Sequence, residues 1–113
     1  MKSPTVLTLQ WLRDNGYIAD KVEHWNPFSK TRKDLFGIID IIAAGKGKVL
    51  GVQATTRANV SARVKKAMEN EYLPAWLTSA RFEVWGWYHI ARGLDDARIV
   101  KFSLNDNGTL STA

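Results

Sequence analysis

The feature that most constrains the fold is a pair of apolar runs separated by a short turn. Residues 35–44 and 49–56 are rich in Ile, Val, Leu and Ala, and a Gly-Lys-Gly-Lys sequence lies between them. Two β-branched runs that flank a glycine-containing turn predict a β-hairpin. Because apolar residues occupy both odd and even positions, we expect both strands to be covered on both faces. The hairpin therefore belongs inside a sheet.

One carboxylate interrupts the first apolar run. Asp40 stands within Ile-Ile-Asp-Ile-Ile, where burying an ionised side chain is costly unless a cation or hydrogen-bond donors lie beside it. On the second run, Gln53 and Thr55 are two residues apart and so share one face of the strand. If Asp40 points to that face, a carboxylate, an amide and a hydroxyl meet there. The alternatives are a structural Asp40 paired with a buried Arg or a Tyr hydroxyl, and a self-satisfied Gln53–Thr55 pair.

This arrangement resembles the core of the PD-(D/E)xK nucleases, most of all the Holliday-junction-resolvase and VRR-NUC types. The family motif is an Asp and, after a short hairpin, a Glu or Gln followed two places later by a Lys. Asp40 matches the Asp and Gln53 matches the Glu or Gln, whereas Thr55 stands at the position of the Lys. The resemblance extends over residues 1–104 in the order of elements and is specific over residues 34–56.

The resemblance implies a nuclease that depends on Mg²⁺ or Mn²⁺. Asp40, the Gln53 side-chain oxygen and the main-chain carbonyl of Ala54 would hold one ion, with waters completing an octahedron. In the family the lysine orients or deprotonates the attacking water, but the hydroxyl of Thr55 is a poor base. Lysines at this position migrate to the following helix in some members, which makes Lys65 the candidate replacement. The implied catalytic set is therefore Asp40, Gln53, Thr55 and Lys65.

Two further acidic residues precede the hairpin. Asp34 lies six residues before Asp40, about 20 Å along an extended chain, so it reaches the same site only if the intervening loop folds back. A structural role, such as pairing with Arg32, is the alternative. Glu23 could supply another acidic ligand from a neighbouring strand, or it could be an ordinary exposed glutamate. His24 and His89 have no partners at metal-ligand spacing and are expected to be ordinary histidines.

The remaining elements are predicted from capping and periodicity. Ser3-Pro4 begins a helix that Asn15-Gly16 ends. Asn59 caps a second helix, whose apolar face carries Arg63 and Lys65 at its edges and Lys66 on the far side. The full set of predicted elements is a helix at 4–14, an extended segment at 17–25, a loop at 28–33, the hairpin, a helix at 59–72, a helix or loop at 75–80, a strand at 81–88, a turn at 93–97 and an edge strand at 98–104.

This order, αβββαββ, predicts an α/β fold with a central mixed sheet of four to five strands flanked by helices. The resemblance implies the same arrangement, a restriction-endonuclease-like core. With 113 residues, the chain is large enough for one domain, expected over residues 1–104. Residues 105–113 are polar and are expected to form a frayed C-terminal tail.

Composition restricts the partners. The net charge of +5 and the basic pI of about 9.7 favour a polyanion, because neutralising phosphates releases counterions. A merely basic domain is the alternative. No apolar run approaches the ~20 residues of a membrane span, no secretory core follows the first residues, and the absence of cysteine excludes disulfides. We therefore expect a cytoplasmic protein without a membrane partner. The predicted phosphate-contacting residues are Lys30, Arg32, Lys33, Arg57, Arg63, Lys65 and Lys66.

Two functions remain open. The first is a metal-dependent DNA endonuclease that acts on structured or single-stranded DNA, for which the resemblance to the resolvases implies a homodimer. The second is a catalytically inactive nuclease-fold domain that binds nucleic acid or a protein partner, which the missing lysine favours. Four aromatic residues could stack on bases or fill the core; these are Trp76, Trp85, Trp87 and Tyr88.

Overall fold

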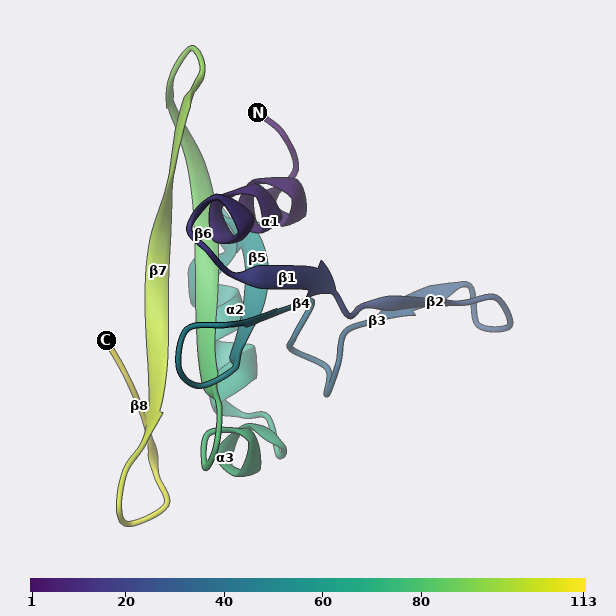
Figure 1. The fold of residues 1–113 in the computed structure, drawn as a ribbon. Coiled ribbons are helices and arrows are strands. Elements are labelled where there is room, and N and C mark those ends of the chain that lie inside the picture. Colours follow the sequence, from purple (N-terminus) through teal and green to yellow (C-terminus); the bar gives the residue numbers. More distant parts are fainter.

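The computed structural model describes residues 1–113 as a mixed α/β fold with a small hairpin projecting from it (Figure 1). In chain order the elements are α1 (Pro4–Asp14), β1 (Ile18–Lys21), β2 (His24–Asn26), β3 (Thr31–Lys33), β4 (Ile41–Ala44), β5 (Leu50–Thr56), the 3₁₀ turn η1 (Arg57–Asn59), α2 (Val60–Met68), α3 (Leu73–Trp76), β6 (Arg81–Ala91), β7 (Leu94–Leu104) and β8 (Leu110–Thr112). None of the helices is long and apolar enough to cross a membrane.

The main sheet has six strands in the order β1-β4-β5-β6-β7-β8. All neighbours are antiparallel except β5 and β6, which are parallel. Parallel neighbours need a crossover, and here η1, α2 and α3 supply it. The predicted α/β class, mixed sheet and flanking helices are confirmed. The predicted four to five strands are too few, because β8 adds a strand at one end of the sheet, where a frayed tail was expected.

Helices cover both faces of the sheet. On one face α1 packs Leu12 against a cluster that includes Val52 and Trp85. On the other face α2 and α3 pack Val60 and Leu73 against a second cluster. The predicted hairpin of β4 and β5 therefore lies inside the sheet and is covered on both sides, as its two apolar runs indicate.

Close packing determines where the second helix layer meets the sheet. Gly86 in β6 lies directly under α2, where a Cβ would collide with the side chain of Val60 and lie 3.1 Å from the Arg57 Cα. Gly51 in β5 lies under α3, where a Cβ would be 3.1 Å from Trp76. These two glycines let the crossover helices approach the strands closely.

The segment before β4 differs most from prediction. The expected continuous strand through residues 35–44 is instead a tight turn followed by β4. The backbone amides and carbonyls of Leu35 and Ile39 bond to each other, with Leu35 N donating over 2.7 Å and Ile39 N over 3.0 Å. Phe36 and Gly37 both have positive φ, 54° and 80°, and glycine tolerates that conformation. The chain therefore reverses direction between Asp34 and Asp40.

The polar segments also contain strands that the pattern missed. The extended segment at 17–25 is divided into β1 and β2, and the expected loop at 28–33 contains β3. The turn expected at 93–97 is confined to the residues before Leu94, so β7 begins at that residue. Residues 110–112, expected in a frayed tail, form β8 at the sheet edge, so β7 is not the edge strand. Asn105 stabilises this hairpin through hydrogen bonds to the hydroxyls of Thr109 and Ser111.

The second predicted helix is shorter than expected. It ends at Met68, and α3 begins at Leu73. Proline is compatible with a first helical turn, so Pro74 lies in the first turn of α3 rather than only ending α2. The Asn70 side chain accepts hydrogen bonds from the backbone amides of Tyr72 and Leu73. Asn59 makes no capping bond and donates its amide to Thr56 instead.

Candidate functional site

Asp40 lies at the junction between the folded-back turn and β4, with its side chain against β5. Its carboxylate is almost fully buried, with 5% of the residue exposed. Oδ2 accepts a hydrogen bond from Gln53 Nε2 at 3.0 Å, and both oxygens lie 3.2 Å from the backbone amide of Ala54. Asp40 and Gln53 therefore share one face of the sheet, the arrangement that the sequence pattern left conditional.

The folded-back turn brings a second carboxylate to the same place. Asp34 Oδ2 lies 3.3 Å from Gln53 Nε2, so one amide group bridges Asp34 and Asp40. The sequence offered a structural pairing of Asp34 with Arg32 as the alternative, but Asp34 forms no ion pair. The turn between Leu35 and Ile39 is what closes the long gap along the chain.

The electrostatics of this pair are unfavourable. The pKa of Asp40 is raised from its usual 3.8 to about 7, first by burial and then by the negative charges of Asp34 and Glu23. The hydrogen bonds from Ala54 and Gln53 lower that pKa but do not compensate. No cationic side chain pairs with Asp34 or Asp40. The structure therefore concentrates carboxylates around an amide without a protein cation to balance them.

Glu23 occupies the loop between β1 and β2, beside this group. The backbone amide of Val22 donates to the Asp40 carbonyl at 2.9 Å, which holds that loop next to Asp40. The Glu23 carboxylate lies 3.9 Å from the Arg32 guanidinium. Glu23 is therefore near enough to influence Asp40 but does not share a hydrogen-bond donor with it.

Thr55 and Lys65 stand apart from the carboxylates. Thr55 is buried on the same sheet face, yet its hydroxyl makes no hydrogen bond to Asp40 or Gln53. Lys65 is exposed on α2. The structure thus places Thr55 beside the predicted site, whereas Lys65 lies at the surface of its helix. Next to the site is a cleft lined by basic residues, and Lys65 is not among them.

That basic cleft has a volume of about 540 Å³ and no apolar residue in its walls. It opens beside Asp34 and is lined by Arg32, Lys33, Asp34, Gly37, Arg63 and Lys66. Residues three apart on a helix share a face, so Arg63 and Lys66 point into the cleft together. Lys66 was expected on the far side of its helix. The apolar pattern did not indicate its role, but its spacing from Arg63 could have.

The remaining predicted phosphate contacts are more dispersed. Lys30 lies in the turn between β2 and β3, outside the cleft. Arg57 lies in η1, where its guanidinium stacks on the ring of Tyr88 with 4.3 Å between the guanidinium carbon and the ring centroid. The structure therefore brings together four of the seven predicted basic residues, those of the basic cleft.

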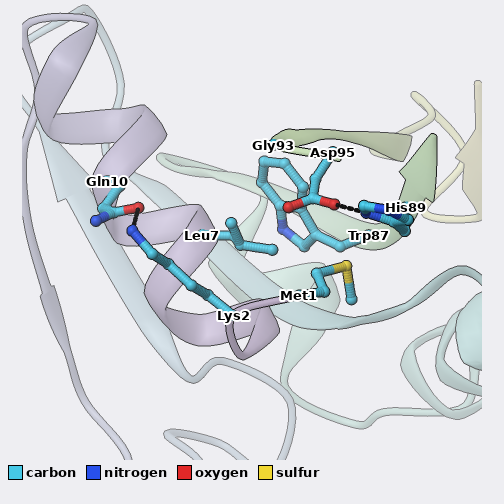
Figure 2. Close-up of a pocket in the computed structure, with 8 residues that line it drawn as sticks. All are labelled: Met1, Lys2, Leu7, Gln10, Trp87, His89, Gly93 and Asp95. Atoms are coloured by element: carbon cyan, nitrogen blue, oxygen red, sulfur yellow. Dashed lines mark hydrogen bonds and ion pairs between the residues drawn. The ribbon is translucent and has the colours of Figure 1, made fainter. Parts of the chain in front are cut away.

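A second cleft of similar volume lies between the start of α1 and the hairpin of β6 and β7 (Figure 2). Its polar groups are largely satisfied by one another. His89 Nδ1 and Asp95 Oδ1 are 2.8 Å apart across the two strands, and Lys2 donates to Gln10 over 3.4 Å. His89 is thus paired with a carboxylate rather than isolated, and none of the predicted catalytic residues lines this cleft.

The aromatic residues proposed for base stacking belong mainly to the core. Trp85 and Trp87 are buried, and their indole N–H groups donate to Glu83 and Thr8 respectively. Trp76 donates to the Arg81 carbonyl. Glu83 is a second buried carboxylate, but Arg81 pairs with it at 3.0 Å. That ion pair and its indole donor make Glu83 a satisfied structural group, unlike Asp40.

The oxygen ligands available to a metal are two carboxylates and an amide. No group of three or more His, Asp and Glu side chains is close enough to hold an ion. Comparison of the chain with models of protein families, with curated proteins and with solved structures finds no match.

Proposed function

We propose that this protein is a metal-dependent endonuclease of the PD-(D/E)xK type that cleaves structured or single-stranded DNA. The observation that carries the proposal is the convergence of the half-buried Asp34 and the buried Asp40 on the Gln53 amide, with no ion pair to either carboxylate. Carboxylates held together in this way repel each other, and a divalent cation would relieve that repulsion.

The residues present fit a Mg²⁺ or Mn²⁺ ion. Both ions prefer oxygen ligands, and Asp34 and Asp40 supply carboxylates. Gln53 now directs its amide nitrogen at both, as expected when the carboxylates are the only nearby acceptors. Rotating the terminal amide would present Oε1 in its place, since the two ends of an amide differ only in donor or acceptor character. When bound, the ion would activate water and stabilise charge on the scissile phosphate.

The basic cleft supports a polyanionic substrate. Arg32 and Lys33 approach from β3, and Arg63 and Lys66 approach from α2, on either side of Asp34. A phosphate in this cleft would be neutralised by several cations beside Asp34. The order of α1, β1, β4, β5, α2 and β6, with its single parallel pair, also supports the nuclease resemblance.

The two candidate functions differ in whether another cation replaces the lysine that the family motif has at position 55. Lys65 remains a prediction from the resemblance, and the structure adds Arg63 and Lys66 as cations that line the cleft beside Asp34. Neither contacts Asp40 in this structure. That separation favours the second candidate, an inactive nuclease-fold domain that binds DNA through the basic cleft.

A cleavage assay with paired variants separates these functions. Purified protein is incubated with circular single-stranded DNA and with a branched duplex, in Mg²⁺, in Mn²⁺ and in EDTA. The nuclease proposal predicts metal-dependent cuts by the wild type and none by Asp40→Asn or Asp34→Asn. Asp106→Asn, which changes an exposed carboxylate in the β7–β8 turn, should cut like the wild type. Binding without cleavage in any metal would leave the inactive domain, and cleavage by Asp40→Asn would refute the site.

A further inference from the structure

The hairpin formed by β2 and β3 projects away from the main sheet and forms no part of it (Figure 1). It contains three paired positions, from His24 opposite Lys33 to Asn26 opposite Thr31. An isolated two-stranded hairpin contributes little stability of its own. We call residues 24–33 the arm. Packing of the core therefore does not explain why the chain forms the arm.

The tip of the arm presents an aromatic ring to solvent. Phe28 is 97% exposed and has no aromatic neighbour. The Asn26 side chain accepts hydrogen bonds from the backbone amides of Phe28 and Ser29, at 2.9 and 3.3 Å. The hydroxyls of Ser29 and Thr31 are 2.7 Å apart. The turn is therefore braced by its own polar side chains, which hold the ring of Phe28 outward.

The arm also carries positive charge from its tip to its base. Lys30 lies in the turn, and Arg32 and Lys33 lie on β3. The last two line the basic cleft, and the next residue is Asp34. The chain therefore leads from an exposed aromatic ring, along a basic strand, directly into the candidate site.

We infer that the arm is a binding element for DNA with unpaired nucleotides, in which Phe28 stacks on an exposed base while Lys30 and Arg32 contact the backbone phosphates. The inference rests on the proposed function, because it names the substrate that the same site would receive. An aromatic ring stacks on any base that is not already stacked on both sides, and a closed duplex offers none.

The dimensions of the arm agree with this substrate. The three residues of β3 span about 10 Å at ~3.3 Å per residue between the tip turn and Asp34. That length corresponds to roughly three nucleotides at ~3.4 Å per stacked step. A base held at the tip would therefore let the following nucleotides run along the basic strand toward Asp34.

The positive charge of the arm favours DNA over a second copy of this chain as the partner of the tip. A second copy of this chain would carry the same positive arm and a net charge of +5, so two arms would repel each other. A polyanion complements Lys30, Arg32 and Lys33 and supplies flat rings for Phe28. Dimerisation through the tip is the competing outcome of the binding test.

The test is equilibrium binding by fluorescence anisotropy in EDTA, which prevents cleavage. The wild type, Phe28→Ala and Phe28→Tyr are titrated into a labelled single strand and into a labelled circular duplex of the same repeated sequence, which has no ends and so no unstacked base. The matched control is Leu94→Ala, which truncates another exposed apolar side chain, on the β6–β7 hairpin. Because Phe28 touches no core residue, circular dichroism melts of Phe28→Ala should match those of the wild type.

We expect Phe28→Ala to weaken single-strand binding about 5- to 150-fold, the range measured for loss of one stacked base. Phe28→Tyr should bind within about twofold of the wild type, because its ring still stacks. Duplex binding should be unchanged in both variants, and Leu94→Ala should bind both DNAs normally.

Three results would overturn the inference in distinguishable ways. Unchanged single-strand binding by Phe28→Ala, with salt-sensitive binding by the wild type, removes the role of the arm and leaves the proposed function intact. Equal losses on single strand and duplex show that Phe28 does not read unpaired bases. A wild-type dimer that Phe28→Ala converts to monomer, measured by sedimentation, assigns the tip to a second copy. Failure of the wild type to bind either DNA refutes the proposed function itself.

Discussion

Replacing Asp40 by Asn separates a functional carboxylate from a structural one through its effect on stability. Asn has nearly the same shape, and its oxygen can accept the hydrogen bond of the Ala54 amide that Asp40 now receives. The Gln53 amide can rotate to accept from the new NH₂ group, which gives up its 3.3 Å hydrogen bond to the half-buried Asp34. The substitution therefore removes a buried negative charge while residue 40 keeps both of its hydrogen-bond partners.

The magnitude follows from the pKa of Asp40. A carboxyl with a pKa of about 7 in the folded chain and 3.8 in the unfolded chain prefers to keep its proton in the folded state. Its contribution to stability is fully present below about pH 3.8 and is lost as the pH rises through about 7. At 1.36 kcal/mol per pKa unit the loss is at most ~4 kcal/mol, and relaxation with water entry should reduce it to about 2–3 kcal/mol.

Urea unfolding of the wild type and Asp40→Asn measures this directly. Near pH 4 the two should have similar free energies of unfolding, and near pH 8 Asp40→Asn should be more stable by about 2–3 kcal/mol. In thermal melts the difference corresponds to roughly 4 °C per kcal/mol for a chain of this size. Asp106→Asn should show no such pH-dependent gain.

The reasoning fails if Asp40→Asn is less stable near pH 8. Removing one partner of a buried charged pair costs about 3–5 kcal/mol. A loss of that size would mean that the Asp40 carboxylate is paired with a positive charge and stabilises the fold.

Three further changes test the surroundings of the site. Thr55→Lys restores the amine of the family motif and should raise the single-turnover cleavage rate at least ~10-fold; an unchanged rate, with folding intact by circular dichroism, would favour a domain that binds without cutting. Lys66→Gln should reduce the slope of log binding constant against log salt concentration for single strands by about 0.7, the effect of one lost phosphate contact. Lys65→Gln, outside the basic cleft, should leave that slope unchanged. The reverse result would remove the cleft as the phosphate site. Gly86→Ala should destabilise the fold by about 1–3 kcal/mol, because the new methyl group has no room beneath Val60; an unchanged melting temperature would contradict the tight contact between α2 and β6.

The central hairpin was predictable because its signal is local. Apolar runs at 35–44 and 49–56 encode burial on both faces, and a period of two places Gln53 and Thr55 on one side. Whether Asp40 shared that side depended on strand register, which the sequence left open. The observed pairing of Ile41 with Val52 places Asp40 beside Gln53.

The position of Asp34 was not predictable in the same way. It depends on a turn between Leu35 and Ile39 that interrupts an otherwise strand-like run and places Phe36 at positive φ. Packing of Ile38 and Ile39 beneath the second helix layer favours that turn, and this is a tertiary effect that local propensity cannot encode.

The polar strands were missed because their stabilising contacts lie elsewhere in the chain or in side-chain hydrogen bonds. Most of β2 lies within the predicted extended segment, but β3 is exposed at every position, so no apolar alternation marks it. In β8, only Leu110 packs against the core, and Asn105 bonds to Thr109 and Ser111 across the turn. Polar composition therefore predicted loops where short hairpins form.

The most direct test of the central claim is a crystal structure of the wild type soaked in Mn²⁺, read from the anomalous signal of the metal. The proposed function predicts one strong peak within roughly 2.1–2.3 Å of a carboxylate oxygen of Asp40, close to Asp34, with the Gln53 amide rotated to present its oxygen. The same soak of Asp40→Asn should show no peak. A saturating soak that leaves Gln53 Nε2 bonded to both carboxylates, with no anomalous density beside Asp40, would contradict the metal-dependent nuclease.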